Sequence, residues 1–398
     1  MLRFSKVFLI AALLLTMPRV YAQTMTAPDI TTQPTLYVVS YAHLDTQWRW
    51  EFPQVISEYL LKTMRVNFDY IDKYPHYVFN WSGSNRYRLM KEYYPADYAR
   101  LKQYVAKGNW YPAGSSVEEG DVNLPSAESI IRQVLYGNTY YRKEFGKASA
   151  EYMLPDCFGF PASLPTILAH AGVKGFSTQK LSSAWQPAPL IGGPDSPEKT
   201  PEGIPFNVGI WEGPDGETVL AALNPGGYGS RIRSDLSKSQ PAPATQNVRR
   251  FRPETDWPSR IDIDGKATGV FADYHYVGTG DIGGAADEES VRLLEATVTQ
   301  GQAVIPPPGF NSGDLAGPAP EGTPVRMGDG PVRVISAAAD QMFLDIKPEQ
   351  AAHLPRYSGD LELNAQRWFM SPITLECESM VKTLLAEVDA NRQPVSAG

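Results

Sequence analysis

Residues 36–48 read LYVVSYAHLDTQW, and this stretch decides the class of fold. Its first part, from Leu36 to Tyr41, is a short apolar run with β-branched residues, which is typical of a buried strand. Two polar residues, His43 and Asp45, follow at once. Because residues two positions apart on an extended chain point to the same side, we expect the strand to end in an imidazole and a carboxylate that face one space.

The chain beyond this strand alternates between the patterns of strands and helices. Further strands are predicted at 76–81, 151–154, 208–211 and 218–223, and helices at 55–74, 98–106, 126–141 and 164–171. Ser126 is a suitable N-cap for a helix with an apolar face made of Ile130, Ile131, Val134, Leu135 and Tyr141. Alternation of this kind favours an α/β fold with a mainly parallel sheet, either open or closed as a barrel.

The start of the chain has the pattern of a targeting signal. Arg3 and Lys6 precede an apolar run that is too short to span a bilayer, and Val-Tyr-Ala at 20–22 supplies small residues for cleavage after Ala22. The alternative is an uncleaved anchor. We predict a signal peptide, and therefore an exported protein, periplasmic or secreted, with no membrane attachment after cleavage.

The composition excludes several classes of protein. The 398 residues are 42% hydrophobic and 20% charged, which is ordinary for a globular protein and argues against wholesale disorder. A net charge of −8 argues against nucleic acid as the main partner, because phosphates require a basic surface. The two cysteines, Cys157 and Cys377, lie far apart, so the fold does not depend on a disulfide framework.

Three sets of residues could carry chemistry, and each also has an ordinary structural explanation. His43 and Asp45 offer nitrogen and oxygen ligands that suit Zn²⁺, or they form a buried hydrogen-bonded pair. Asp156 follows a predicted strand, where a carboxylate can bind a metal or attack an electrophilic carbon, or can simply cap a turn. Asp281 is the carboxylate of a glycine-rich loop, residues 278–283, which could be a plain turn.

The glycine-rich loop matches G-x-G-x-x-G literally, yet we reject a dinucleotide site there. Such a site needs an acidic residue about 20 positions further on, and that region reads VIPPP. Near the first strand, Trp48 could stack on a sugar ring, whereas Trp50 is expected to pack under the strand end. A metal pair, a nucleophilic carboxylate and a loop carboxylate together indicate an acid/base glycosidase with a metal that grips the sugar.

At these residues the sequence resembles the class II α-mannosidases, glycoside hydrolase family 38. The motifs that carry the resemblance are Tyr37–Trp48, Pro155–Gly159, Ser177–Lys180, Gly278–Asp281 and Gly359–Leu363. The resemblance implies a (β/α)-type, barrel-like catalytic domain with about seven mainly parallel strands. It also implies one bound zinc ion, although other divalent ions are possible, and hydrolysis of terminal α-mannosides in a mannose-containing glycan, with retention through a glycosyl-enzyme.

The resemblance further implies a role for each candidate residue. His43, Asp45 and Asp156 are expected to bind the metal, with Asp156 also the nucleophile, and Asp281 is expected to be the general acid/base. Trp48, Lys180 and Tyr228 are expected to bind the sugar.

Two features depart from the family pattern. The family's fourth zinc ligand, a histidine in a His-Asp motif, has no counterpart here. After Leu363 the chain reads NAQRW instead of a loop rich in His and Ser/Thr. We therefore expect a truncated form. Its expected parts are a signal peptide at 1–22, a linker at 23–34, the catalytic domain at 35–370 and the first helix of a helical bundle at 371–398.

Two other functions remain open at this point. A metal-dependent carbohydrate deacetylase also uses Asp and His at strand ends, but it would need further His ligands close in sequence. A catalytically impaired carbohydrate-binding fragment would explain the missing fourth ligand. An aryl α-mannoside and an N-acetylated sugar, assayed with and without Zn²⁺, separate these possibilities.

Overall fold

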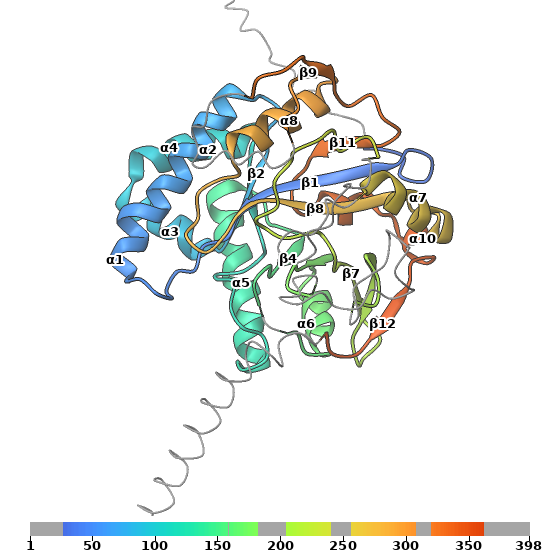
Figure 1. Ribbon diagram of the computed structural model, residues 1–398. Helices are drawn as coiled ribbons and strands as arrows, with labels where there is room; N and C mark the ends of the chain where they lie inside the picture. The colour runs from blue at the N-terminus through green and yellow to red at the C-terminus, as the bar shows by residue number, and fades with distance from the viewer. Residues whose placement is uncertain (1–26, 158, 182–203, 240–255, 308–319, 362–398) are drawn as a thin grey trace, which may run out of the picture.

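A computed structural model describes residues 27–157, 159–181, 204–239, 256–307 and 320–361 (Figure 1). The predicted signal peptide at 1–22, the predicted helix at 371–398 and Cys377 lie outside the described residues. The predicted domain limits at residues 22 and 370 therefore stay predictions.

The first sheet is built around β1 (Thr35–Ala42), whose eight residues are all buried. β8 (Ala272–Thr279) runs parallel to β1 along its whole length. On the opposite edge of β1, β11 (Arg333–Ser336) pairs with the first half and β2 (Phe79–Ser82) with the second. β3 (Trp110–Ala113) lies beside β2. A strand buried on both faces needs a near-continuous apolar sequence, which is why the pattern at 36–41 predicted β1.

The second sheet holds the middle of the chain. Its strands, in spatial order, are β12 (Arg356–Ser358), β6 (Val208–Glu212), β7 (Thr218–Ala222), β5 (Gly175–Ser177) and β4 (Glu151–Met153). Neighbours are parallel except for the antiparallel pair of β6 and β7. A separate antiparallel ribbon joins β9 (Gln302–Ala303) to β10 (Val325–Arg326).

The predicted α/β class with mostly parallel strands is confirmed, whereas the predicted strand number is wrong. Twelve strands, not about seven, occur in the described residues, and they form two five-stranded sheets and one ribbon without a closed sheet among them. β8 was not predicted because polar residues interrupt its apolar pattern. Asp273 is buried in an ion pair with Arg260 at 2.6 Å, and the buried His275 ring lies 3.0 Å from the Pro225 carbonyl.

Helices cover both sheets. Figure 1 shows α1 to α4 gathered at one end of the molecule, α7 and α10 at the other, and α6 beside the second sheet. The helices are α1 (Phe52–Gln54), a π-helix (Val55–Leu60), α2 (Leu61–Lys73), α3 (Ser84–Tyr93), α4 (Pro95–Lys107), α5 (Ala127–Phe145), α6 (Leu164–His170), α7 (Trp257–Thr268), α8 (Glu288–Val298), α9 (Gln341–Asp345) and α10 (Pro348–Ala351). Within the described ranges, none of them has the length and apolar character needed to cross a membrane.

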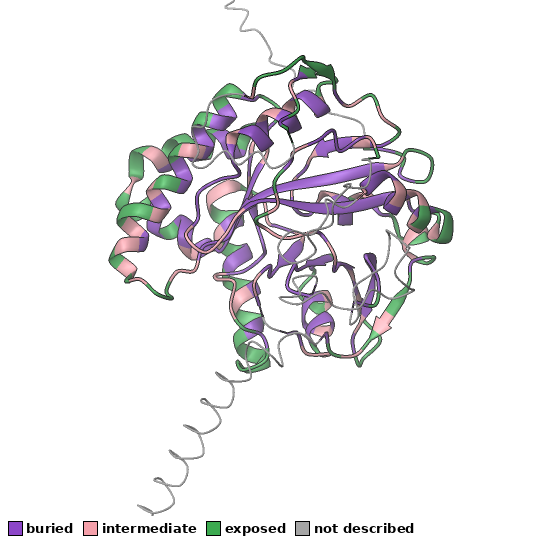
Figure 2. Ribbon diagram, in the orientation of Figure 1, coloured by how far each residue is buried: buried purple, intermediate pink, exposed green. Residues whose placement is uncertain are grey.

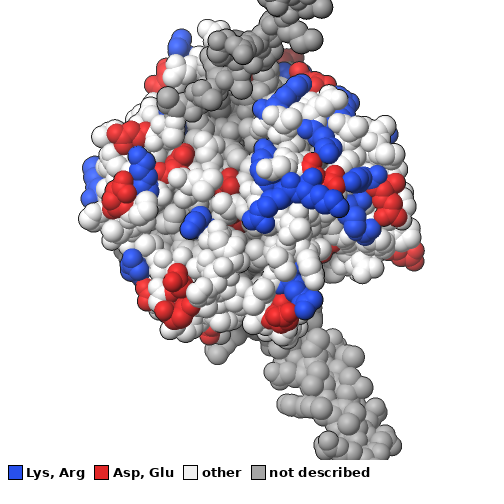
Figure 3. Space-filling view, turned by 180° about the vertical axis from the view of Figure 1, so that it is seen from behind, with Lys and Arg blue, Asp and Glu red and all other residues white. Residues whose placement is uncertain are grey.

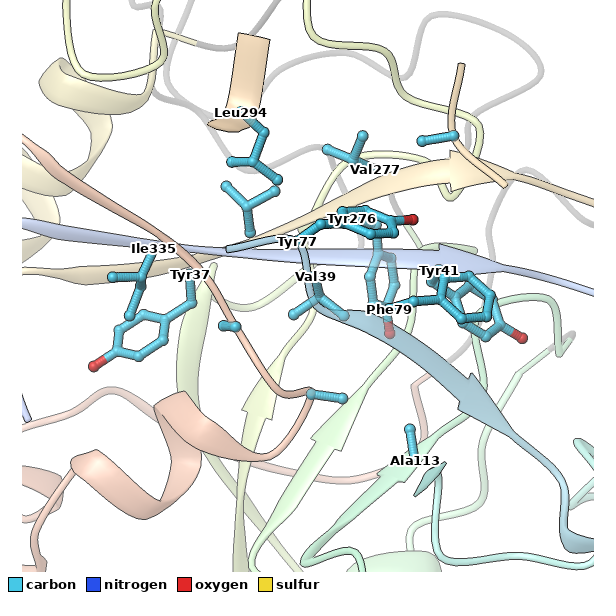
Figure 4. Close-up of a cluster of buried hydrophobic side chains, with 14 of the residues drawn as sticks. Tyr37, Val39, Tyr41, Tyr77, Phe79, Ala113, Tyr276, Val277, Leu294 and Ile335 are labelled. Atoms are coloured by element: carbon cyan, nitrogen blue, oxygen red, sulfur yellow. The ribbon is translucent and has the colours of Figure 1, made fainter. Parts of the chain in front are cut away.

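The core is rich in aromatic residues and lies around the strands of the two sheets, as the buried strands in Figure 2 show. Around the first sheet, the buried cluster includes Tyr37, Tyr41, Phe79, Tyr276 and Ile335 (Figure 4). The surface carries charges of both signs. On the face seen in Figure 3, Lys and Arg side chains gather in one region with Asp and Glu directly beside them.

Helix α5 begins as the sequence predicted. The Ser126 side chain caps it by accepting a hydrogen bond from the Ser129 amide at 3.3 Å. The predicted apolar face is only partly correct. Ile130 and Val134 are buried, but Ile131 and Leu135 are 44% and 54% exposed. Residues 130 and 134 are one turn apart and face the core, while each next residue is rotated about 100° away from it.

Gly137 allows α5 to approach the loop after β3. A Cβ atom at this position would lie 2.4 Å from the Ser116 carbonyl carbon and 2.6 Å from its oxygen. Gly137→Ala is therefore expected to lower the free energy of unfolding by about 1–3 kcal/mol, although alanine favours helices. Denaturant unfolding measures this change. Tyr136→Ala, at an exposed neighbour, is the control, and equal stability of Gly137→Ala and the wild type would contradict the close approach.

Glu151 is a buried carboxyl group at the start of β4. Its Oε2 accepts hydrogen bonds from the Gly114 amide at 3.0 Å and the Ser149 hydroxyl at 2.7 Å, while Oε1 has no hydrogen-bond partner among the described residues. Burial raises the pKa of Glu151 from 4.5 to about 8. Between these two values the folded protein keeps a proton that the unfolded chain releases, so stability falls as the pH rises through this window.

Glu151→Gln is expected to remove this part of the pH dependence. The wild type should lose stability between about pH 5 and pH 8, by an amount on the order of a few kcal/mol, and the neutral glutamine should flatten the slope. Urea unfolding at a series of pH values is the measurement. Glu128→Gln changes an exposed carboxylate and serves as the control. An unchanged slope in Glu151→Gln would show that another group causes the loss.

Candidate active site

The predicted site residues lie where strands of the two sheets end. His43 and Asp45 follow β1, Asp156 follows β4, Lys180 follows β5 and Asp281 follows β8. β1 is parallel to β8, and β4 is parallel to β5. These five site residues all follow the carboxyl ends of the four strands. This is the location at which α/β folds usually place their functional groups.

His43, Asp45 and Asp156 form a cluster with the donor set of a metal site. The His43 Nε2 atom lies 3.2 Å from Asp45 Oδ1 and 3.8 Å from Asp156 Oδ2. One ligand atom from each residue lies within 4.8 Å of the others. One imidazole nitrogen and two carboxylate oxygens fit a divalent cation such as Zn²⁺.

The electrostatics of the cluster also favour a cation. Burial alone would lower the pKa of His43, but the carboxylates of Glu119, Asp45 and Asp156 raise it to about 10. Three carboxylates thus surround one ring, and the site attracts positive charge.

Glu119 is a member of the site that sequence reasoning missed. Its Oε2 lies 2.8 Å from His43 Nδ1, the ring nitrogen that points away from Asp45 and Asp156. Its Oε1 lies 3.0 Å from Arg86 and accepts short hydrogen bonds from the hydroxyl groups of Tyr41 and Ser82. Burial alone would raise the pKa of Glu119, but Arg86 and His43 lower it to about 2, so the group is a carboxylate.

Lys180 contacts Asp156 directly. Its ammonium group forms an ion pair with Asp156 Oδ1, whereas the other carboxylate oxygen, Oδ2, faces His43. Burial raises the pKa of Asp156 even though His43 and Lys180 both favour its charged form. The predicted sugar-binding lysine therefore lies within reach of the predicted nucleophile.

Asp281 and Tyr228 form the second side of the site. Asp281 has a φ of 64°, and its carbonyl accepts a hydrogen bond from the Asp45 amide at 2.9 Å. Burial and the charges of Asp156 and Asp281 raise the pKa of Tyr228, so its hydroxyl is protonated and donates to Asp281 Oδ1 at 3.0 Å. A Cβ at Gly280 would lie 1.8 Å from the Tyr228 ring, so glycine is required there.

Tyr228 also contacts the metal cluster. Its ring stacks on the His43 ring, with centroids 5.2 Å apart and planes inclined by 25°. Tyr228 thus contacts both His43 and Asp281, and it links the metal cluster to the carboxylate of the glycine-rich loop.

Trp48 is 55% exposed, and its ring meets the Trp50 ring edge-on with centroids 5.7 Å apart. The Arg49 guanidinium lies over its ring, 4.2 Å from the centroid. Trp50 packs against Tyr59 with centroids 5.3 Å apart, and its indole NH donates to the Asp45 carbonyl at 3.0 Å, in keeping with the predicted packing role.

Comparisons with known proteins identify relatives of this chain. The model of one protein family, described as "Glycosyl hydrolases family 38 N-terminal domain", matches residues 33–258. This range includes His43, Asp45 and Asp156 but not Asp281. The chain is 38% identical over 193 residues to "Alpha-mannosidase G" of Dictyostelium discoideum, covering 48% of this chain and 16% of that protein. It is 32% identical over 194 residues to "Alpha-mannosidase 2C1" of Homo sapiens, covering 49% of this chain and 17% of that protein.

A solved structure shows the same fold. It is an alpha-mannosidase from Enterococcus faecalis V583, with a TM-score of 0.54 and 15% sequence identity, and the match covers 83% of this chain and 31% of that one. The match spans 16–17% of the length of the two mannosidases from Dictyostelium discoideum and Homo sapiens.

Proposed function

Because this chain belongs to the glycosyl hydrolases of family 38, as an N-terminal domain of that family, we propose that it hydrolyses terminal α-mannosides with retention of configuration. One observation carries the proposal: His43, Asp45 and Asp156 offer ligand atoms that all lie within 4.8 Å of one another. The names of the relatives, alpha-mannosidases, support a mannose-containing glycan as the substrate.

We assign one divalent ion, Zn²⁺, to His43, Asp45 and Asp156. When bound, the ion would supply positive charge that holds sugar hydroxyl groups and offsets the charge of the carboxylates. Three protein ligands leave positions open, which is the pattern of a catalytic rather than a structural zinc site.

Asp156 and Asp281 perform the two steps of the reaction, Asp156 as the nucleophile and Asp281 as the general acid and then the general base. Asp156 attacks the anomeric carbon as the bond to the leaving oxygen breaks, and Asp281 gives that oxygen its proton. Asp281, now a carboxylate, then takes a proton from water as the water displaces Asp156. Two inversions at one carbon give net retention.

Other side chains prepare these two carboxyl groups. Lys180 holds Asp156 Oδ1, which fixes the orientation of the nucleophile. Tyr228 donates to Asp281 and orients the acid. Trp48, three residues beyond Asp45 and largely exposed, offers an aromatic surface to the apolar face of a sugar.

His43→Ala is expected to abolish metal binding. Purified wild-type protein should contain about one Zn²⁺ per chain and hydrolyse an aryl α-mannoside but not an N-acetylated sugar, and a chelator should remove the activity. Metal analysis beside both assays is the test. His76→Ala, at an exposed histidine paired with Glu295, should keep its metal. Equal metal content in His43→Ala and the wild type would overturn the ligand assignment.

Export is a separate part of the proposal. Residues 1–22 combine basic residues, an apolar run and a small-residue cleavage site, so we assign them as a signal peptide. N-terminal sequencing of the mature protein should begin at Gln23.

A further inference from the structure

Glu119 occupies the far side of the proposed metal site. Its carboxylate faces His43 Nδ1 at 2.8 Å, whereas His43 Nε2 faces Asp45 and Asp156. We propose that Glu119 is a positioning residue that fixes the tautomer and orientation of His43 for metal binding. This inference rests on the proposed metal site, and it assigns a part of that site that lies beyond the three ligands.

The chemistry of imidazole makes the two contacts of His43 dependent on each other. A neutral ring has one NH and one lone pair, and an ionised carboxylate can only accept a hydrogen bond. The proton must therefore lie on Nδ1 when that atom contacts Glu119, which leaves the Nε2 lone pair directed at the carboxylates of Asp45 and Asp156. A carboxylate partner of this kind also makes the ring a stronger ligand.

The contacts of Glu119 show that it cannot itself be a metal ligand. Oε2 is used by His43, and Oε1 accepts from Arg86, Tyr41 and Ser82. The side chains of Glu119 and Arg86 are each only 2% exposed. Both oxygens thus have partners in a buried network, and the carboxylate acts on the metal only through His43.

Arg86 connects this network to the backbone between the ligands. One guanidinium nitrogen pairs with Glu119, and the other donates to the carbonyl of Leu44, the residue between His43 and Asp45. A single buried cation therefore holds the orienting carboxylate and the peptide that carries two ligands.

The loop that carries Glu119 is fixed by neighbouring helices. Residues at the start of α3 bind it, since the Ser84 amide donates to the Ser116 carbonyl at 2.9 Å. From α5, Gln133 Oε1 accepts the amides of Val117 and Glu118 at 3.1 and 2.9 Å. Glu119 is consequently in place before any ligand arrives, as preorganisation requires.

The test compares two neighbouring carboxylates. Glu119→Gln keeps the shape and removes the charge, and Glu118→Gln is the matched control, because Glu118 contacts Thr46 and Asn85 but not His43. Competition with a chelator measures the Kd for Zn²⁺ in the full chain. Glu119→Gln should weaken Zn²⁺ binding about 10–100-fold, and Glu118→Gln should leave it unchanged.

A spectroscopic measurement on the wild type covers the case in which Glu119→Gln does not fold. In ¹⁵N-labelled protein loaded with ¹¹³Cd²⁺, His43 should show metal coupling at Nε2 and a protected proton at Nδ1. Metal coupling at Nδ1 would overturn the inference. So would a folded Glu119→Gln that binds Zn²⁺ as tightly as the wild type.

The outcomes separate this inference from the function on which it rests. If the wild type binds Zn²⁺ and His43→Ala does not, the proposed site stands, and the result for Glu119→Gln alone decides the positioning role. If the wild type binds no divalent ion, the site itself is wrong and the positioning role is wrong with it.

Discussion

Asp156→Asn is expected to lower the turnover of α-mannosides by about 10⁴-fold or more, because it removes the proposed nucleophile. The transition state resembles an oxocarbenium ion and needs an anion on the face opposite the leaving group. Asp156 is placed for this role by His43 at 3.8 Å and by the ion pair with Lys180. Steady-state kinetics with an aryl α-mannoside give the magnitude.

Covalent trapping identifies the carboxylate directly. A fluorinated mannosyl donor should accumulate as a glycosyl-enzyme in the wild type, and mass spectrometry should find the label in the peptide LPDCFG, residues 154–159. Asp215→Asn changes an exposed carboxylate paired with His170 and should label and turn over like the wild type. A label on any other carboxylate would reassign the nucleophile.

The parts of the fold that the sequence predicted are those with a local signal. β1 has a near-continuous apolar pattern, and the cap of α5 depends on one hydroxyl near one amide. β8 lacked such a signal, because Asp273 and His275 lie inside it and are satisfied by Arg260 and Pro225, which other segments supply. The arrangement in two sheets likewise depends on pairings between strands far apart in the chain.

The same distinction explains which site residues could be found. His43 and Asp45 share one strand end, so their spacing suggested either that both bind one metal ion or that they form a buried hydrogen-bonded pair. Glu119 follows β3, whose sequence WYPA is short and contains a proline, so no strand was expected before it. Its role depends on His43, a residue 76 positions away, and on Arg86. Glu119 is next to a second acid, Glu118, and no periodic pattern in the sequence shows which of the two is buried.

Asp281→Ala is expected to affect substrates in proportion to how poor their leaving groups are. The first step on a mannoside with a poor leaving group needs a proton from Asp281, so kcat/KM should fall by about 10²–10⁴-fold. An activated aryl mannoside does not need this proton, so it should form the glycosyl-enzyme nearly normally and then stall, because no base activates water. A burst of aryl alcohol followed by slow turnover is the expected time course.

Azide separates a missing base from a distorted site. Azide needs no deprotonation, so it should react with the stalled glycosyl-enzyme of Asp281→Ala and restore turnover as mannosyl azide. Tyr228→Phe keeps the carboxyl group but removes its hydrogen bond at 3.0 Å, so it should show a smaller loss and no rescue. Equal losses on good and poor leaving groups, without azide rescue, would mean that Asp281 only shapes the loop beside Gly280 and that another group is the acid.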